Sequence, residues 1–274
     1  MMWKIKFLIK CAAGILPLSY HFWRCFGIFR HGKMDDLEYA QRIFSKHFRF
    51  FEGETSRKIV LEIGPGDSII SGLIANSQGF EQTYLVDVSD FVSKDIRFYE
   101  PAMKRLFKDQ ISVASFHELL SKMQISYLTN GLNSLRMIES ESIDFIFGNS
   151  VIQHIHKSQI EIYLREMFRI LKFGSVASFR IDLRDMIDDS LNHLRFSEKF
   201  WNSIFMSKMI FHTNRLRSSD WEKICTNVGF SITHSKYDRW EKLPMSRNNF
   251  SSEFDKYKTN ELLVSGLDLV LKKK

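Results

Sequence analysis

The most informative stretch of the chain reads Val60-Leu61-Glu62-Ile63-Gly64-Pro65-Gly66-Asp67-Ser68. Its apolar, partly β-branched start predicts a buried parallel strand, and its two glycines predict a tight turn before a helix. Because glycine has no side chain, the backbone of such a turn can come close to a ligand. Open α/β sheets bind nucleotide-like molecules at turns of this kind.

Predicted strands and helices alternate along the chain around this turn. Apolar runs predict strands at 58–63, 82–87, 125–128, 143–147, 176–182, 230–236 and 262–271. Helical patterns lie before and between them, at 35–51, 68–76, 90–109, 116–123, 158–171 and 219–229. This alternation predicts a mostly parallel sheet with helices on both faces. We therefore expect an α/β fold, a Rossmann-like three-layer sandwich whose seven-stranded sheet has one antiparallel edge strand.

Composition favours one large domain with additions. The chain has 274 residues, of which 44% are hydrophobic, so it can bury a substantial core. Its three cysteines, Cys11, Cys25 and Cys225, have no paired spacing. This spacing argues against a disulfide framework or a zinc site and fits a reducing compartment. We therefore expect a cytoplasmic protein.

The positive charge is concentrated near the N-terminus. The net charge is +7, and residues 1–60 carry 11 Lys or Arg against 5 Asp or Glu, whereas the remainder carries 28 against 27. A general nucleic-acid binder would carry its positive face on the main body of the domain, so we expect no nucleic-acid partner. We divide the chain into a basic helical N-terminal extension, 1–56, and a main domain, 57–274.

The segment 1–30 is both basic and apolar. Its uncharged run from Cys11 to Trp23 is too short to span a bilayer, and Pro17 interrupts it. No convincing signal-peptide cleavage site follows. Two interpretations stay open: a helix packed on its own domain, or a peripheral anchor on anionic lipid at the inner face of the membrane.

Three motifs accompany the predicted strands in order: Glu62-Ile63-Gly64-Pro65-Gly66, Tyr84-Leu85-Val86-Asp87-Val88 and Ile143-Asp144-Phe145-Ile146-Phe147-Gly148-Asn149-Ser150-Val151-Ile152-Gln153-His154-Ile155. With this order and spacing, residues 58–182 resemble the class I S-adenosylmethionine-dependent methyltransferases. The resemblance implies S-adenosyl-L-methionine as cofactor. A nicotinamide-dependent oxidoreductase shares part of the pattern, but its G-x-G-x-x-G signature needs a small residue where this chain has Ile69.

The resemblance assigns the first two motifs to the cofactor. The turn Gly64, Pro65 and Gly66 would pass under the amino-acid part of the cofactor, and Glu62 would support its ammonium group. Asp87 ends a predicted strand about twenty residues beyond the glycines, where a carboxylate can accept hydrogen bonds from ribose hydroxyls. A structural hydrogen bond for Glu62 and a strand-end cap for Asp87 are the alternatives.

Two asparagines follow later strands. The resemblance places the backbone of Asn149 beside the methyl group that is transferred. It also places adenine contacts in the loop after the third strand, where this chain has Asn130 and the family often has an acidic residue.

The candidate bases for a hydroxyl acceptor are His154 and Asp182. A base accelerates such a reaction by roughly a hundred- to ten-thousandfold. The alternatives are a loop histidine bonded to backbone for His154 and a loop cap for Asp182. His154 and His156 lack further ligands at metal-site spacing, so we expect no metal.

Acceptor recognition is expected from the segment 183–218, where aromatic residues and arginines mix. Such residues suit a sugar, a phosphate or another anionic small molecule, and this segment looks similar to methyltransferases of bacterial surface-polysaccharide synthesis. We expect O-methylation of a small molecule or a glycan intermediate. Two alternatives remain: an RNA or protein methyltransferase, suggested by the basic composition, and a non-catalytic scaffold that binds S-adenosylmethionine.

Overall fold

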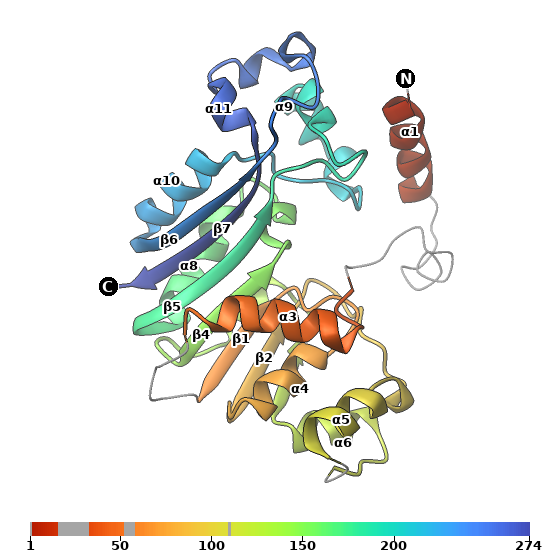
Figure 1. Ribbon diagram of the computed structural model, residues 1–274, viewed down its shortest axis with the longest axis vertical. Coiled ribbons are helices and arrows are strands. Elements are labelled where there is room, and N and C mark those ends of the chain that lie inside the picture. Colours follow the sequence, from red (N-terminus) through yellow and green to blue (C-terminus); the bar gives the residue numbers. More distant parts are fainter. Residues whose placement is uncertain (1, 16–32, 52–57, 109–110) are drawn as a thin grey trace.

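The computed structural model describes residues 2–15, 33–51, 58–108 and 111–274. A seven-stranded sheet runs through it in the order β3-β2-β1-β4-β5-β7-β6 (Figure 1). The strands are β1 (Ile59–Ile63), β2 (Gln82–Val86), β3 (Ile125–Leu128), β4 (Ile143–Asn149), β5 (Leu171–Asp182), β6 (Phe230–Arg239) and β7 (Val264–Lys273). The first five pair in parallel, whereas β7 is antiparallel to both β5 and β6.

This sheet confirms the predicted fold class, with one difference in detail. The antiparallel strand β7 lies between β5 and β6, so β6 forms the edge of the sheet. Local pattern cannot order strands within a sheet, because a strand's neighbours are decided by packing across the whole molecule.

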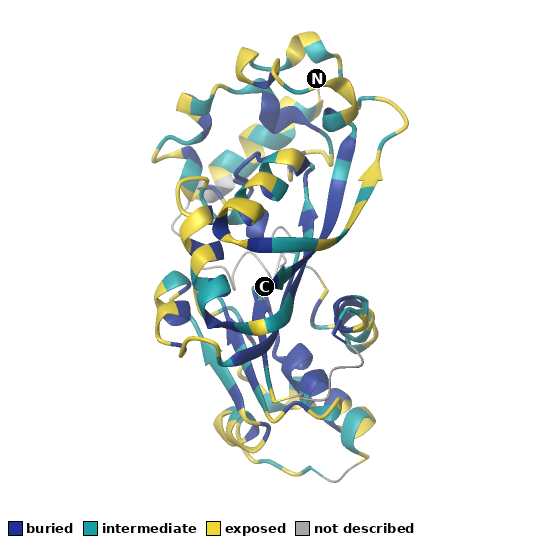
Figure 2. Ribbon diagram, turned by 90° about the vertical axis from the view of Figure 1, so that its left-hand side faces the viewer, coloured by how far each residue is buried: buried dark blue, intermediate teal, exposed yellow. Residues whose placement is uncertain are grey.

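Helices cover both faces of the sheet and give it three layers. One face is covered by α3 (Leu37–Phe48), α4 (Ile70–Ser77), α5 (Glu100–Phe107) and α6 (Phe116–Lys122). The other is covered by α7 (Leu132–Arg136), α8 (Ile160–Ile170) and α10 (Ser218–Val228). Successive strand residues serve opposite faces: Val60 packs into the first cluster and Leu61 into the second. The buried residues therefore gather on the strands and the inner helix faces (Figure 2).

Helix α3 confirms the predicted helix that precedes the first strand. It begins where the Asp36 carboxylate accepts a hydrogen bond from the Tyr39 N–H at 2.8 Å. Phe44 on its inner face meets Phe147 of β4 edge to face, with ring centroids 5.5 Å apart. Because aromatic pairs of this kind stabilise a contact beyond simple burial, α3 is fixed directly against the centre of the sheet.

The cover segment, residues 183–218, and the stretch 240–262 lie together beyond the ends of β5, β6 and β7 (Figure 1). Their short elements are η3 (Asn192–Arg195), α9 (Glu198–Trp201), η4 (Met206–Lys208), η5 (Arg247–Asn249), η6 (Ser252–Phe254) and α11 (Thr259–Leu262). Two further short helices, η1 (Ile96–Phe98) and η2 (Ile152–His154), follow β2 and β4.

Helix α1 (Met2–Ile15) packs against the cover segment. Phe7 stacks on Phe196 with 5.0 Å between centroids, and Lys6 forms an ion pair with Asp188. Its opposite side is apolar and exposed: Ile5 is 57% exposed and Ile9 60%. Among the described residues, no helix is long and apolar enough to cross a bilayer. The remainder of the segment 1–30 lies outside the described residues, and the division at residues 56 and 57 stays a prediction.

Candidate functional site

The turn after β1 has the backbone that its glycines allow. Gly64 and Gly66 have φ of 70° and 72°, in the left-handed region that favours glycine. The Gly64 N–H donates to the Val86 carbonyl oxygen at 2.8 Å, which ties the turn to the end of β2. A Cβ atom at Gly64 would lie 2.3 Å from Cγ2 of Val151. Position 64 therefore requires glycine for both conformation and space.

Asp87 meets this turn at the rim of the sheet. Its carboxylate accepts hydrogen bonds from the N–H groups of Val88 at 2.7 Å and Gly66 at 3.4 Å. Its backbone carbonyl accepts from the Gly131 N–H at 2.8 Å. The structure thus brings together the predicted turn, the predicted acid and the loop after β3, because the carboxyl ends of parallel strands share one edge.

Glu62 is buried directly beneath the turn. It is 1% exposed, and its carboxylate accepts a hydrogen bond from the Ser71 hydroxyl of α4. Burial raises the pKa of Glu62 to about 8; the charge of Asp87 adds to this rise, and the Ser71 hydrogen bond opposes it. At neutral pH the side chain is therefore mostly uncharged in the protein alone.

The loop after β3 closes the rim opposite the turn. Asn130 is exposed, and its backbone N–H donates to the Ser134 hydroxyl at 3.0 Å. Tyr163 of α8 was not predicted as part of this region: its hydroxyl accepts from the Leu132 N–H at 3.0 Å. Burial raises the pKa of Tyr163, and the nearby Asp87 contributes to the rise. The only signal for Tyr163 in the sequence was its position on the inner face of a predicted helix.

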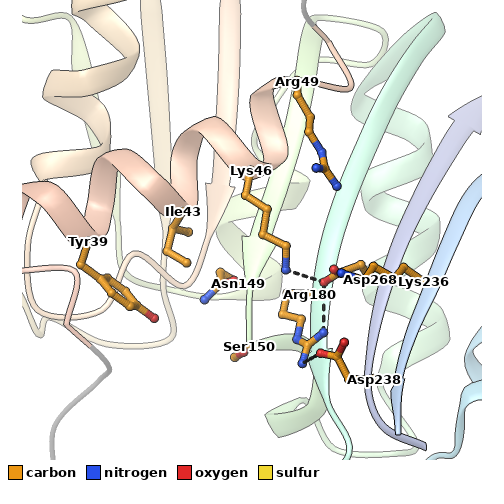
Figure 3. A pocket seen from close by; sticks show the side chains of 10 residues that line it. All are labelled: Tyr39, Ile43, Lys46, Arg49, Asn149, Ser150, Arg180, Lys236, Asp238 and Asp268. Carbon is orange, nitrogen blue, oxygen red and sulfur yellow. Dashed lines mark hydrogen bonds and ion pairs between the residues drawn. The ribbon is translucent and has the colours of Figure 1, made fainter.

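Asn149 is the last residue of β4, and it lines a cavity. The next residue, Ser150, has a φ of 55°, and its N–H donates to the Arg180 carbonyl at 2.8 Å. The cavity has a volume of about 340 Å³. Figure 3 shows its lining from α3, β4, β5, β6 and β7: Tyr39, Ile43, Lys46, Arg49, Asn149, Ser150, Arg180, Lys236, Asp238 and Asp268. Apart from Asn149, none of these was predicted as a site residue.

The charged residues of this cavity form a network. Asp268 accepts from Lys46 at 2.6 Å and from Arg180 at 3.3 Å, and Arg180 also pairs with Asp238 at 2.6 Å (Figure 3). Burial alone would raise the pKa of Asp268, but Lys46 and Arg180 lower it below its ordinary value. The carboxylate is therefore ionised at neutral pH.

Neither predicted base, His154 nor Asp182, is among the residues that line this cavity. His154 lies in η2, and its Nδ1 is 2.9 Å from the His212 carbonyl oxygen. Asp182 ends β5, and both its oxygens accept from the Arg184 guanidinium, at 3.0 and 2.7 Å. Within the described parts of the chain, no cluster of three or more His, Cys, Asp or Glu residues could hold a metal ion.

The cover segment uses its arginines internally. The Arg215 guanidinium donates to the carbonyl oxygens of His193 and Phe196 and lies over the Trp201 ring. Arg217 is fully buried and donates to the carbonyls of Leu183 and Val264. These two guanidinium groups hold the segment together, whereas sequence alone suggested that they face an acceptor.

Comparison with known proteins agrees with this geometry. Residues 36–235 match a family model described as a methyltransferase domain. No curated protein matches the chain.

Solved structures share the fold at low identity. A methyltransferase from Archaeoglobus fulgidus is 14% identical over 85% of this chain and 94% of its own, with a TM-score of 0.50. One from Methanosarcina mazei is 15% identical over 82% and 96%, also with a TM-score of 0.50. Phosphoethanolamine N-methyltransferase 2 of Haemonchus contortus is 15% identical over 85% of this chain, with a TM-score of 0.48, and this chain spans about half of it, 52%. With the family match extending from α3 into β6, this chain belongs to the class I S-adenosylmethionine-dependent methyltransferases.

Proposed function

We propose that this methyltransferase methylates an oxygen atom of a small molecule or a glycan intermediate. The observation that carries the proposal is the position of the cavity. It lies between α3 and the face of the sheet at β5, β7 and β6, and Asn149 and Ser150 border it at the edge where the glycine turn meets Asp87. A volume of about 340 Å³ suits a small molecule or the end of a glycan.

The residues at the rim fit S-adenosylmethionine. The turn from Gly64 to Gly66 presents backbone without a side chain at either glycine, and we assign it to the amino-acid part of the cofactor. We assign the partly exposed carboxylate of Asp87 to the ribose hydroxyls, and Glu62 to support of the ammonium group. Asn130 and Asn149 would line the adenine and methyl ends.

When bound, S-adenosylmethionine supplies an electrophilic methyl group on a sulfonium sulfur, so the acceptor oxygen gains a C–O bond as the C–S bond breaks. The acceptor hydroxyl must also lose its proton. We assign this proton to His154, because its Nδ1 faces a carbonyl oxygen and must carry a hydrogen, which leaves Nε2 as the basic atom of the neutral ring. Asp182 is the second candidate, with both oxygens engaged by Arg184.

We also propose that the protein works in the cytoplasm, with α1 as a peripheral contact to the membrane. The exposed apolar side of α1 supports this contact, since amphipathic helices bind the interface of a bilayer by burying such a side.

Calorimetry with S-adenosylhomocysteine tests the cofactor assignment. Asp87→Ala should weaken binding by roughly tenfold or more, because two charge-assisted hydrogen bonds to the ribose are lost. Asp90→Ala is the matched control, since Asp90 is exposed on the following loop and pairs with Lys94. Equal affinities for Asp87→Ala and the wild type would remove the ribose assignment.

Incubation of cell extract with deuteromethyl-labelled cofactor tests the acceptor class and should yield a labelled small molecule or glycan. Label found only in RNA or protein would contradict the acceptor class.

A further inference from the structure

We propose that the cavity beside Asn149 binds an oxyanion, a phosphate or carboxylate group carried by the acceptor at a distance from the methylated atom. This inference rests on the proposed function, because it takes the cavity as the acceptor site. It adds the chemical feature by which that acceptor is recognised.

The first argument is the balance of charge in the lining. Four basic and two acidic side chains line the cavity: Lys46, Arg49, Arg180 and Lys236 against Asp238 and Asp268. The lining thus has an excess of two positive charges. The cations come from α3, β5 and β6, which are distant in sequence, yet they converge on one hollow (Figure 3).

The second argument is that the ion-pair network leaves part of this charge unmatched. Asp268 is shared by Lys46 and Arg180, and Asp238 pairs with Arg180. Lys236 and Arg49 form no ion pair with any residue that the structure describes. A ligand with negative charge would complete the network, because charge-assisted hydrogen bonds to oxyanions are among the strongest polar contacts in proteins.

The third argument is that the central guanidinium is preorganised. Arg180 lies opposite Asp268 in the antiparallel pairing of β5 with β7, and Lys236 lies opposite the same aspartate from β6. The Arg180 guanidinium lies over Gly266, where a Cβ atom would come within 2.2 Å of Nη2. Two carboxylates and a glycine floor therefore hold this side chain. A fixed guanidinium loses less conformational entropy when it binds an oxyanion.

The uncharged lining also suits an oxyanion. Tyr39, Asn149 and Ser150 add hydroxyl and amide groups, which can donate hydrogen bonds to phosphate or carboxylate oxygens. Because Asn149 is the last residue of β4 and Ser150 follows it, an acceptor held here would extend from the basic side of the cavity toward the rim at Asp87.

The test uses the full-length protein saturated with S-adenosylhomocysteine and titrated with inorganic phosphate or, separately, acetate. We expect saturable binding of at least one probe, and the stronger probe indicates whether the group is phosphate or carboxylate. Lys236→Gln and Arg49→Gln should each weaken it about two- to fivefold, as expected for exposed charges. Lys223→Gln on α10 and Arg165→Gln on α8 are matched controls outside the cavity lining and should leave it unchanged.

Absence of saturable binding of both probes, or equal weakening by controls and cavity variants, would overturn the inference. Binding of S-adenosylhomocysteine is measured first, so a failure of the proposed function is distinguished from a failure of the oxyanion site.

A second readout uses the product labelled with deuteromethyl groups. It should be retained on an anion exchanger at neutral pH, and labelled product found only in the unbound fraction would also overturn the inference.

Discussion

Glu62 is a carboxylic acid buried almost completely beneath the rim. Its pKa is raised from 4.5 to about 8. Between pH 4.5 and pH 8, Glu62 is therefore mostly protonated in the folded protein and mostly ionised in the unfolded chain. Stability from this group is fully present below pH 4.5 and is lost as the pH rises through 8. Glu62→Gln should therefore flatten this decline, by an amount on the order of a few kcal/mol, since one pKa unit corresponds to about 1.36 kcal/mol.

Urea unfolding of both proteins across this pH range measures the effect. The stability advantage of Glu62→Gln should grow with pH. Glu161→Gln, an exposed glutamate of α8, is a control that retains the wild-type slope. Parallel pH profiles for the wild type and Glu62→Gln would show that folding does not raise the pKa of Glu62.

Gly64 is constrained twice, by its φ of 70° and by Val151. Gly64→Ala should cost more stability than Gly79→Ala, because Gly79 has a φ of 90° but no atom within 4 Å of its missing Cβ. We expect about 1 kcal/mol for Gly79→Ala and at least about twice that for Gly64→Ala. Thermal unfolding measures both, and Val151→Ala should recover part of the larger loss. Equal losses at both glycines would mean that Val151 moves aside freely.

Single residues also show which parts of the site could be predicted from the sequence. Gly66 and Asp87 were predictable together, because each follows a strand and parallel strands end at one edge. The pair Lys46 and Asp268 was not, because 222 residues separate them and only the finished sheet brings them together. The roles of the predicted site residues remain proposals.

At the scale of elements, the alternation of strands and helices was predictable and the ends were not. Helix α8 stops at Ile170 and β5 starts at Leu171, whereas the sequence pattern placed the helix at 158–171 and the strand at 176–182. Leu171 pairs with Ile143 of β4, and Gly174, with a φ of 82°, lies within the strand at an irregular register. Pairing with β4 thus overrides the local signal of a helix end.

The cover segment depends on one buried arginine that joins it to β7. Arg217 donates to the carbonyls of Leu183 and Val264 and is fully buried. Arg217→Met should destabilise the protein by about 3–5 kcal/mol, because both carbonyls lose their donor in a buried place. Urea unfolding measures this, with Arg165→Met, an exposed arginine of α8, expected within about 0.5 kcal/mol of the wild type. A loss as small for Arg217→Met as for the control would mean that the segment is held by its aromatic contacts alone.

At the scale of the whole molecule, α1 extends the surface with an apolar side that the protein leaves uncovered. Met2, Ile5, Leu8 and Ile9 are 66%, 57%, 65% and 60% exposed, whereas Lys6 faces the cover segment. The excess of positive charge in residues 1–60 belongs to the same part of the chain. Together these features predict binding to anionic bilayers, with apolar burial as the main contribution and charge as the supporting one.

Flotation with anionic liposomes tests this prediction on the intact chain. The wild type should float with anionic vesicles and less with neutral ones, because positive charge near the surface adds about 1 kcal/mol for each lysine or arginine. Ile5→Ser combined with Ile9→Ser should reduce the floating fraction severalfold, since two exposed apolar side chains are lost while Phe7 and Lys6 still hold α1 in place. Ile162→Ser, an exposed isoleucine of α8, is the matched control. If the double variant, or a chain without residues 1–30, floats as well as the wild type, α1 is a structural helix of the domain and not a membrane contact.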